Sequence, residues 1–191
     1  MSTGLTAGFA DPVHDTQRCF RSVLEAMSRP GRIATVAGVE PPAPLCVASA
    51  AVLLTLIDLD TAFWLDPDAG SARAWIAFHC GAPAAGGPVD AAFALSLGLP
   101  DLARFNTGTH EGPETSATLV VQLRSLTGGA PLRLRGPGLK DSATIAPVGL
   151  PADFPAIWHR NRGLFPAGID LILCAGDTLA ALPRTVSVQE A

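Results

Sequence analysis

The chain has 191 residues, of which 48% are apolar and 16% are charged, and its net charge is −4. This composition excludes a disordered chain and predicts a single domain over residues 1–191 with a sizeable core. Lys140 is the only lysine and no basic run is present, so nucleic acid is not expected as a partner.

The N-terminal half predicts helices that alternate with short strands. Asp11-Pro12 is typical of a helix start and Pro30-Gly31 of a helix end, which predicts a helix over residues 14–28. Its apolar residues recur near helical spacing and are expected to form one stripe: Val13, Phe20, Val23, Leu24 and Met27. Further along, we expect strands at 33–36, 61–65 and 91–95, an apolar helix at 45–56, and a helix at 71–78 capped by Ser71.

The C-terminal half predicts mainly strands. Residues 100–105 predict one or two helical turns, and residues 117–123 form the clearest strand pattern. Residues 132–135 alternate apolar and basic side chains, as in a strand with one wet face, and Gly128-Gly129 predicts a hairpin-like turn between the two strands. A helix at 151–159 and strands at 169–174 and 179–182 follow, the last two joined by a turn at Gly176-Asp177. This order predicts an α/β fold, a three-layer sandwich around a mixed sheet.

Neither a membrane span nor an export signal is predicted. The longest apolar run, residues 45–57, is shorter than the ~20 residues that cross a bilayer. Residues 1–11 lack the features of a signal peptide, so we expect a cytoplasmic protein. The mean hydropathy of +0.33 predicts that other subunits cover some apolar surface. The cysteines have no metal-ligand spacing, so we expect buried, reduced thiols and no zinc at Cys19, Cys46, Cys80 and Cys174.

The sequence offers few residues for self-contained catalysis. It lacks a Walker A loop, a dinucleotide-binding glycine motif, a nucleophile elbow and a zinc-protease motif. The four histidines are scattered, and each is more often structural than catalytic. His110 is the best of them, because it lies in a loop. Asp58 and Asp60 could chelate Mg²⁺, but a solvated turn is favoured and no metal is expected.

A ligand groove is hypothesised from three segments. The Gly136-Pro137-Gly138 turn follows a strand, where a phosphate could approach the backbone, although a tight turn also explains it. Asp170 begins an apolar strand and needs a partner, for which Arg184 is the natural candidate. We expect the two to pair or to line one pocket, against the alternative that Asp170 is an ordinary solvated acid. The groove would be lined by Gly136 to Gly138, Asp170 and Arg184.

An ordered set of motifs covers nearly the whole chain. They lie at residues 20–31, 52–61, 78–83, 107–109, 113–114, 117–119, 125–129, 132–138, 165–173 and 183–185. The set resembles the PhnH family, a subunit of the bacterial carbon–phosphorus lyase core complex. The first dozen residues and the loop at 67–72 are not closely matched, which puts contacts through that loop in doubt.

The resemblance implies a fold similar to that of pyridoxal-phosphate-dependent transferases but without the cofactor, in agreement with Lys140 as the only lysine. It implies a homodimer that also assembles with the sibling subunits PhnG, PhnI and PhnJ. The assembly joins a phosphonate to the ribose of ATP, displaces adenine and yields a ribose 1-phosphonate 5-triphosphate. ATP and phosphonate are then substrates of the complex, and no catalytic residue is carried over to this chain.

Three functional readings stay open. The chain is an accessory subunit that completes another subunit's active site, or it contributes Arg184 or His110 directly to nucleotide or phosphonate binding. Alternatively, it is a stand-alone small-molecule enzyme of α/β type or a nucleotide- or phosphonate-binding protein, which the missing motifs disfavour. For association, we expect the first helix and the apolar helix of residues 45–57 to supply the surfaces.

Overall fold

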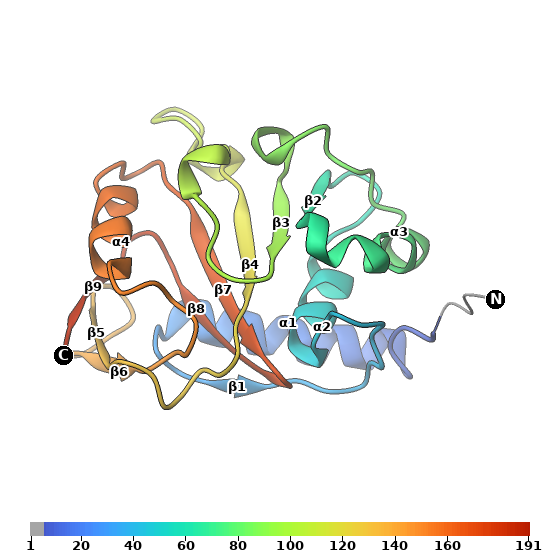
Figure 1. Cartoon of the computed structure of the whole chain (residues 1–191), viewed down its shortest axis with the longest axis horizontal. Coiled ribbons are helices and arrows are strands. Elements are labelled where there is room, and N and C mark those ends of the chain that lie inside the picture. The colour runs from blue at the N-terminus through green and yellow to red at the C-terminus, as the bar shows by residue number, and fades with distance from the viewer. Residues whose placement is uncertain (1–5) are drawn as a thin grey trace.

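The computed structural model describes residues 6–191 as two β-sheets with four α-helices (Figure 1). The helices are α1 (Pro12–Ser28), α2 (Val47–Leu56), α3 (Arg73–Cys80) and α4 (Phe154–Arg162). The strands are β1 (Ala34–Thr35), β2 (Phe63–Leu65), β3 (Phe93–Ser96), β4 (Thr118–Gln122), β5 (Leu132–Arg135), β6 (Ala143–Ile145), β7 (Asp170–Ala175), β8 (Thr178–Leu182) and β9 (Ser187–Glu190). No helix within residues 6–191 is both long and apolar enough to cross a membrane.

The larger sheet is mixed, as predicted. Its six strands lie in the order β1-β8-β7-β4-β3-β2, with parallel pairing from β2 through β3 and β4 to β7. β7 and β8 form the predicted antiparallel hairpin, and the turn between them contains Gly176 at a positive φ of 56°. β1 adds an antiparallel edge to β8.

Apolar residues on both faces of the central strands explain their nearly continuous apolar sequences. Val120 of β4 and Ile172 of β7 belong to the core that also contains residues of α1, α2 and α3. Leu119 and Leu171, the preceding residue on each strand, belong to a second core with α4 and the smaller sheet. Because successive side chains of a strand point to opposite faces, the sheet lies between two covering layers. The predicted α/β class with a mixed sheet between two layers is therefore confirmed, but the second sheet in one of these layers was not predicted.

The predicted hairpin between residues 117–123 and 132–135 is wrong. β4 pairs with β3 and β7, whereas β5 pairs with β6 and β9 in a separate antiparallel sheet. The reason is burial: three consecutive residues of β4 are buried and need cover on both faces, whereas β5 alternates buried leucines with exposed Arg133 and Arg135. The solvent-exposed face of β5 was predicted, but its pairing with β6 and β9 was not.

The first helix begins as predicted, since the Asp11 side chain accepts a hydrogen bond from the backbone N–H of His14 at 3.2 Å. The predicted apolar stripe is only partly confirmed, because Val23 is buried and Met27 packs against the core. The buried face consists mainly of small residues, Cys19, Val23 and Ala26, which let α1 lie against α2 and β8. Three of the larger apolar side chains point outward, with exposed fractions of 76% for Val13, 45% for Phe20 and 52% for Leu24.

The apolar helix α2 is buried inside the chain, as expected for a helix that is apolar on nearly all sides. The further expectation that it supplies an association surface is wrong. Its residues 48–53 are all buried in the core shared with α1 and the sheet. Gln122, at the end of β4, fixes its N-terminus. The Gln122 Oε1 accepts hydrogen bonds from the Cys46 backbone N–H at 2.8 Å and the Ser49 hydroxyl at 2.6 Å, and its Nε2 donates to the Pro44 carbonyl at 2.8 Å.

Ser71 does not cap α3, contrary to the prediction. Residues 67–72 form a 3₁₀ segment that leads into α3, and the Asp66 carboxylate accepts a hydrogen bond from the Asp68 backbone N–H at 3.0 Å. The Ser71 hydroxyl instead donates to the Ala43 carbonyl at 2.9 Å. The 3₁₀ segment begins at the Asp66-Pro67 pair, which is typical of a helix start, and α3 itself follows from Arg73.

All four cysteines are free thiols, and Cys19 and Cys174 are buried as predicted, whereas Cys46 and Cys80 are half-buried. Burial raises the pKa of Cys80 to about 11, with a smaller contribution from the Asp58 carboxylate. Burial also raises the pKa of Cys19 and Cys174. These three thiols therefore stay protonated at neutral pH and are poor nucleophiles.

We expect Gln122→Ala to lower the free energy of unfolding by about 1–3 kcal/mol, because three polar partners around the start of α2 lose their hydrogen bonds. Urea denaturation followed by circular dichroism measures this loss. Gln189→Ala, on the exposed part of β9, is the matched control and should change the value by less than about 0.5 kcal/mol. Equal values for the two variants would contradict the role given to Gln122.

Candidate functional site

Asp170 and Arg184 form a half-buried ion pair, which was one of the two alternatives expected for Asp170. Asp170 begins β7 and Arg184 follows β8, and their side chains are only 15% and 14% exposed. One Asp170 oxygen accepts a hydrogen bond from the backbone N–H of Arg184 at 2.7 Å. The other accepts from the Arg184 Nε at 3.1 Å and from Nη2. The pair thus ties the start of β7 to the end of β8.

The Arg184 guanidinium also connects two loops. Its Nη1 donates to the Pro113 carbonyl at 2.9 Å and to the Pro166 carbonyl at 3.4 Å, and its Nη2 donates to the Ser116 hydroxyl. A guanidinium has five N–H donors, and together with the two contacts to Asp170 all five are used within this chain. Arg184 therefore acts as an anchor for neighbouring segments in this structure.

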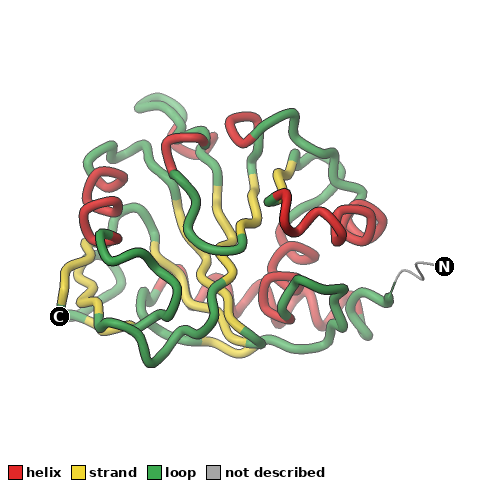
Figure 2. The backbone as a smooth tube through the Cα atoms, in the orientation of Figure 1, coloured by secondary structure: helices red, strands yellow, loops and turns green. Residues whose placement is uncertain are grey.

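The loop of residues 106–116, which carries His110, rests on this anchor. It extends beyond the strand ends at the top of the molecule, and Figure 2 shows most of it as loop. Its turn is closed by hydrogen bonds in both directions between Thr109 and Gly112, and the Asn106 side chain donates to the Thr115 carbonyl at 2.9 Å. His110 and Glu111 are exposed at its tip. The structure thus places His110 on a loop whose base Arg184 holds, but not in a cleft.

The two candidate glycines are explained by close backbone approaches. A Cβ at Gly138, which has a φ of 83°, would lie 2.1 Å from the Ser28 carbonyl oxygen. A Cβ at Gly136 would lie 3.2 Å from the Thr185 carbonyl oxygen, so this turn does reach the segment next to Arg184.

The hypothesised groove is only partly assembled. A cleft of about 340 Å³ lies at the turn of residues 136–138, and its lining residues are Pro137, Arg162, Phe165 and Thr185. Asp170 and Arg184 are not among them, because their side chains are used in the half-buried anchor.

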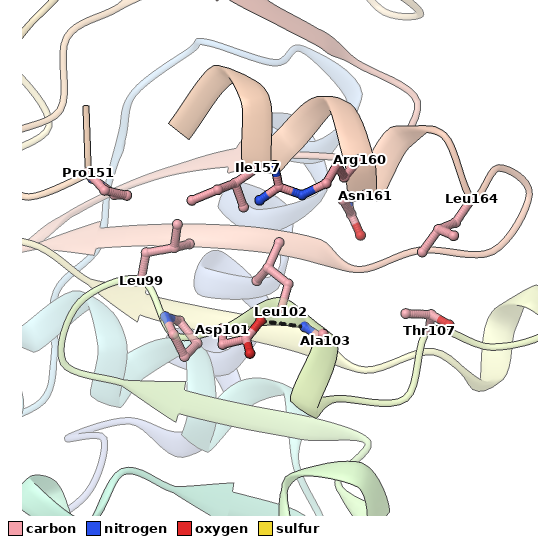
Figure 3. Close-up of a pocket in the computed structure, with 11 residues that line it drawn as sticks. Leu99, Asp101, Leu102, Ala103, Thr107, Pro151, Ile157, Arg160, Asn161 and Leu164 are labelled. Carbon is pink, nitrogen blue, oxygen red and sulfur yellow. Dashed lines mark hydrogen bonds between the residues drawn. The ribbon is translucent and has the colours of Figure 1, made fainter. Parts of the chain in front are cut away.

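A second cleft of about 440 Å³ lies between α4 and the segment of residues 99–107 (Figure 3). In Figure 3, Ile157, Arg160 and Leu164 lie on one side of this cleft, and Leu99 and Leu102 lie on the other. The lining is mainly apolar. Its charged side chains are Arg160 and Asp101, and the Asp101 carboxylate accepts a hydrogen bond from the Ala103 backbone N–H at 3.1 Å.

Two buried side chains hold α4 in place along these clefts. The Trp158 indole N–H donates to the Val186 carbonyl at 2.7 Å. The Asn161 side chain both donates to the Ile169 carbonyl and accepts from the Ile169 N–H, each at 2.8 Å. Asn161 thereby fixes the residue directly before Asp170, so α4, the ion pair and the clefts belong to one connected region.

The end of α4 presents cations beside exposed apolar side chains. Its last turn carries His159, Arg160 and Arg162, and the next residues include Leu164 and Phe165, which are 44% and 59% exposed. None of these three side chains takes part in the ion pairs found within residues 6–191. Sequence reasoning missed this surface, although a histidine and two arginines followed by Leu164-Phe165 were visible as a run.

The side chains that line the cleft of about 440 Å³ define what it can bind. The lining of the larger cleft includes no cysteine or histidine and a single hydroxyl side chain, that of Thr107. Within the described residues, no group of three His, Cys, Asp or Glu side chains could hold a metal ion. The region can bury an apolar group and can place a guanidinium beside an anion.

Comparisons with known proteins agree with one another. Residues 7–189 match a family model described as bacterial phosphonate metabolism protein (PhnH). The chain is 45% identical over 192 residues to the α-D-ribose 1-methylphosphonate 5-triphosphate synthase subunit PhnH of Rhizobium meliloti (strain 1021), with 96% of this chain and 95% of that protein covered. It is also 33% identical over 178 residues to HtxG of Stutzerimonas stutzeri, named as a candidate C–P lyase subunit, with 90% and 85% covered.

We expect Asp170→Asn to lower the free energy of unfolding by about 1–3 kcal/mol, because the Arg184 guanidinium would lose its charged partner. The loop of residues 106–116 should become more accessible to proteases and exchange its amide hydrogens faster. Asp141→Asn, at an exposed position, serves as the matched control. Unchanged stability and unchanged hydrogen exchange in Asp170→Asn would refute the anchoring role.

Proposed function

This chain belongs to the PhnH family of bacterial phosphonate metabolism proteins, and on that basis we propose that it is a subunit of a C–P lyase assembly that makes ribose 1-methylphosphonate 5-triphosphate. The observation that carries the proposal is the 45% identity to the subunit of Rhizobium meliloti across nearly the whole of both chains. A match of this extent includes the core, both clefts and the Arg184 anchor, rather than one isolated motif.

The role within the assembly is that of an accessory subunit. The larger cleft includes no cysteine or histidine in its lining, and burial keeps three of the four thiols protonated. Rigid surfaces with exposed apolar residues suit association instead. ATP and a phosphonate are then substrates of the whole complex, this chain binds no cofactor, and its place is the cytoplasm.

Homodimer formation along α1 is part of the proposal. Val13, Phe20 and Leu24 lie seven and four residues apart and form an exposed apolar ridge along the helix. A two-fold dimer brings the same patch of both copies together, so a ridge on one helix can pack against its own copy. The other faces of the assembly are then left for the sibling subunits PhnG, PhnI and PhnJ.

A relationship to the fold of pyridoxal-phosphate-dependent transferases is also proposed. The support is the mixed sheet with helices on its faces. A catalytic Schiff-base lysine needs a low pKa and hence a desolvated environment, whereas Lys140 is exposed in the turn between β5 and β6. A cofactor-free use of the fold is therefore consistent with where this lysine lies.

Direct binding of a nucleotide or phosphonate by this chain is a second candidate function. The cleft of about 440 Å³ favours it, because its size suits a small molecule and Arg160 lies in its lining. Among the residues predicted to bind a ligand, His110 is exposed, and its side chain makes no hydrogen bond within residues 6–191. Calorimetry of the isolated chain with ATP and with methylphosphonate tests this function.

Co-expression with the sibling subunits tests the main proposal. We expect the complete complex to release adenine from ATP in the presence of methylphosphonate, the complex without this chain to lose that activity, and the isolated chain to have none. His110→Ala in the assembled complex separates the two roles: retained activity supports an accessory role, and lost activity supports a direct contribution. Turnover by the purified chain alone would overturn the proposal.

The dimer surface has its own test. Phe20→Ser combined with Leu24→Ser should convert the isolated chain from dimer to monomer, as measured by sedimentation, because the ridge loses most of its apolar area. Phe78→Ser combined with Leu59→Ser, which also changes one exposed phenylalanine and one exposed leucine, is the matched control and should leave the dimer intact. A dimer that persists in the α1 variant would exclude this surface.

A further inference from the structure

We infer that the end of α4 is a docking surface for an apolar segment of a partner subunit that carries carboxylates beside its apolar side chains. The inference rests on the proposed function as a subunit and concerns where a sibling binds. The surface consists of Arg160, Arg162, Leu164 and Phe165 together with the two clefts that they line.

The apolar part of the surface is a ridge between two concavities. Leu164 lines the cleft of about 440 Å³ and its neighbour Phe165 lines the cleft of about 340 Å³. Both side chains remain substantially exposed, at 44% and 59%. A partner that places apolar side chains in the two clefts would cover the ridge from both sides, which is how buried anchors are arranged in stable interfaces.

The charged part of the surface determines the chemistry of the partner. Arg160 forms no ion pair within residues 6–191, and the contact found there for the Arg162 side chain is a 3.4 Å hydrogen bond to the Thr185 carbonyl. Within residues 6–191, Arg18, Arg29, Arg32 and Arg184 have carboxylate partners, whereas the other arginines form no ion pair. What distinguishes Arg160 and Arg162 is that each lines a cleft next to an exposed apolar side chain, Leu164 or Phe165. Unpaired arginines beside an apolar ridge are complementary to carboxylates beside apolar side chains.

The arrangement of the arginines disfavours a polyphosphate as the occupant. Arg160 and Arg162 are two positions apart on α4, and side chains at this spacing do not face each other. Each arginine lines a different cleft, so the two do not converge on one cluster of phosphate oxygens. A partner segment that extends across the ridge can meet both.

The surface is also held rigidly, which favours binding. Trp158 and Asn161, on the buried side of the same helix, are fixed by hydrogen bonds to Val186 and Ile169. A partner that binds here orders few additional side chains, so less conformational entropy opposes association.

Charge reversal in the assembled complex tests the inference. Arg160→Glu combined with Arg162→Glu should weaken co-purification with the sibling subunits by at least about tenfold, because partner carboxylates would face glutamates. Arg133→Glu combined with Arg135→Glu, on the exposed face of β5, makes the same change in net charge and should have little effect. Phe165→Ser should also weaken retention, and Phe78→Ser, another exposed phenylalanine, should not.

Each outcome has a defined meaning. Full retention of the siblings by the α4 variants, or equal loss in both charge-reversed variants, would overturn the docking surface. The docking surface would also be overturned if the isolated chain bound ATP and the Arg160→Glu variant did not, because the cleft of about 440 Å³ would then be a nucleotide site. If the wild-type chain itself fails to co-purify with any sibling, the proposed function fails instead. Circular dichroism and thermal melting verify that each variant is folded, and Leu164→Ser replaces Phe165→Ser if that variant does not fold.

Discussion

The half-buried ion pair between Asp170 and Arg184 joins four segments of this structure. It connects the start of β7 to the end of β8, and the same guanidinium holds both the base of the 106–116 loop and the segment that follows α4. A charge removed from water needs a partner and filled hydrogen bonds, and Arg184 has both. Its hydrogen-bond partners lie up to 71 positions away from Arg184 in the sequence. One side chain therefore fixes the relative positions of elements that apolar packing alone would leave less specified.

This construction gives the molecule firmly held surfaces. Trp158 and Asn161 fix α4 from its buried side, so that its outer side can present Arg160, Leu164 and Phe165 in a constant arrangement. The thiols that could act as nucleophiles are suppressed by burial at three of four positions. A chain built in this way is suited to association, which is consistent with its family.

The sequence predicted well those features that depend on local pattern. The start of α1 at Asp11-Pro12, the continuous burial of β7 and the turn at Gly176 all follow from residues adjacent in the chain. The sequence analysis failed for features that depend on contacts between elements distant in the sequence. The supposed hairpin at Gly128-Gly129 did not form, because the apolar β4 was drawn into the centre of the larger sheet. Val13, Phe20 and Leu24 of α1 face outward, whereas Cys19, Val23 and Ala26 form most of its buried face.

The sequence by itself determined the α/β class and the family, and it pointed to Arg184 as a partner for Asp170, since an acid at the head of an apolar strand favours a nearby countercharge. The structure decided for the pairing and against an ordinary solvated acid. Only the tertiary structure decided what that pair does. The sequence could not show that all five guanidinium donors are consumed inside the chain, nor that Gly138 is needed because the Ser28 carbonyl lies against it. Both facts depend on which remote backbone atoms come within hydrogen-bond or van der Waals distance. Packing of the complete chain sets those distances, and no pattern of neighbouring residues encodes them.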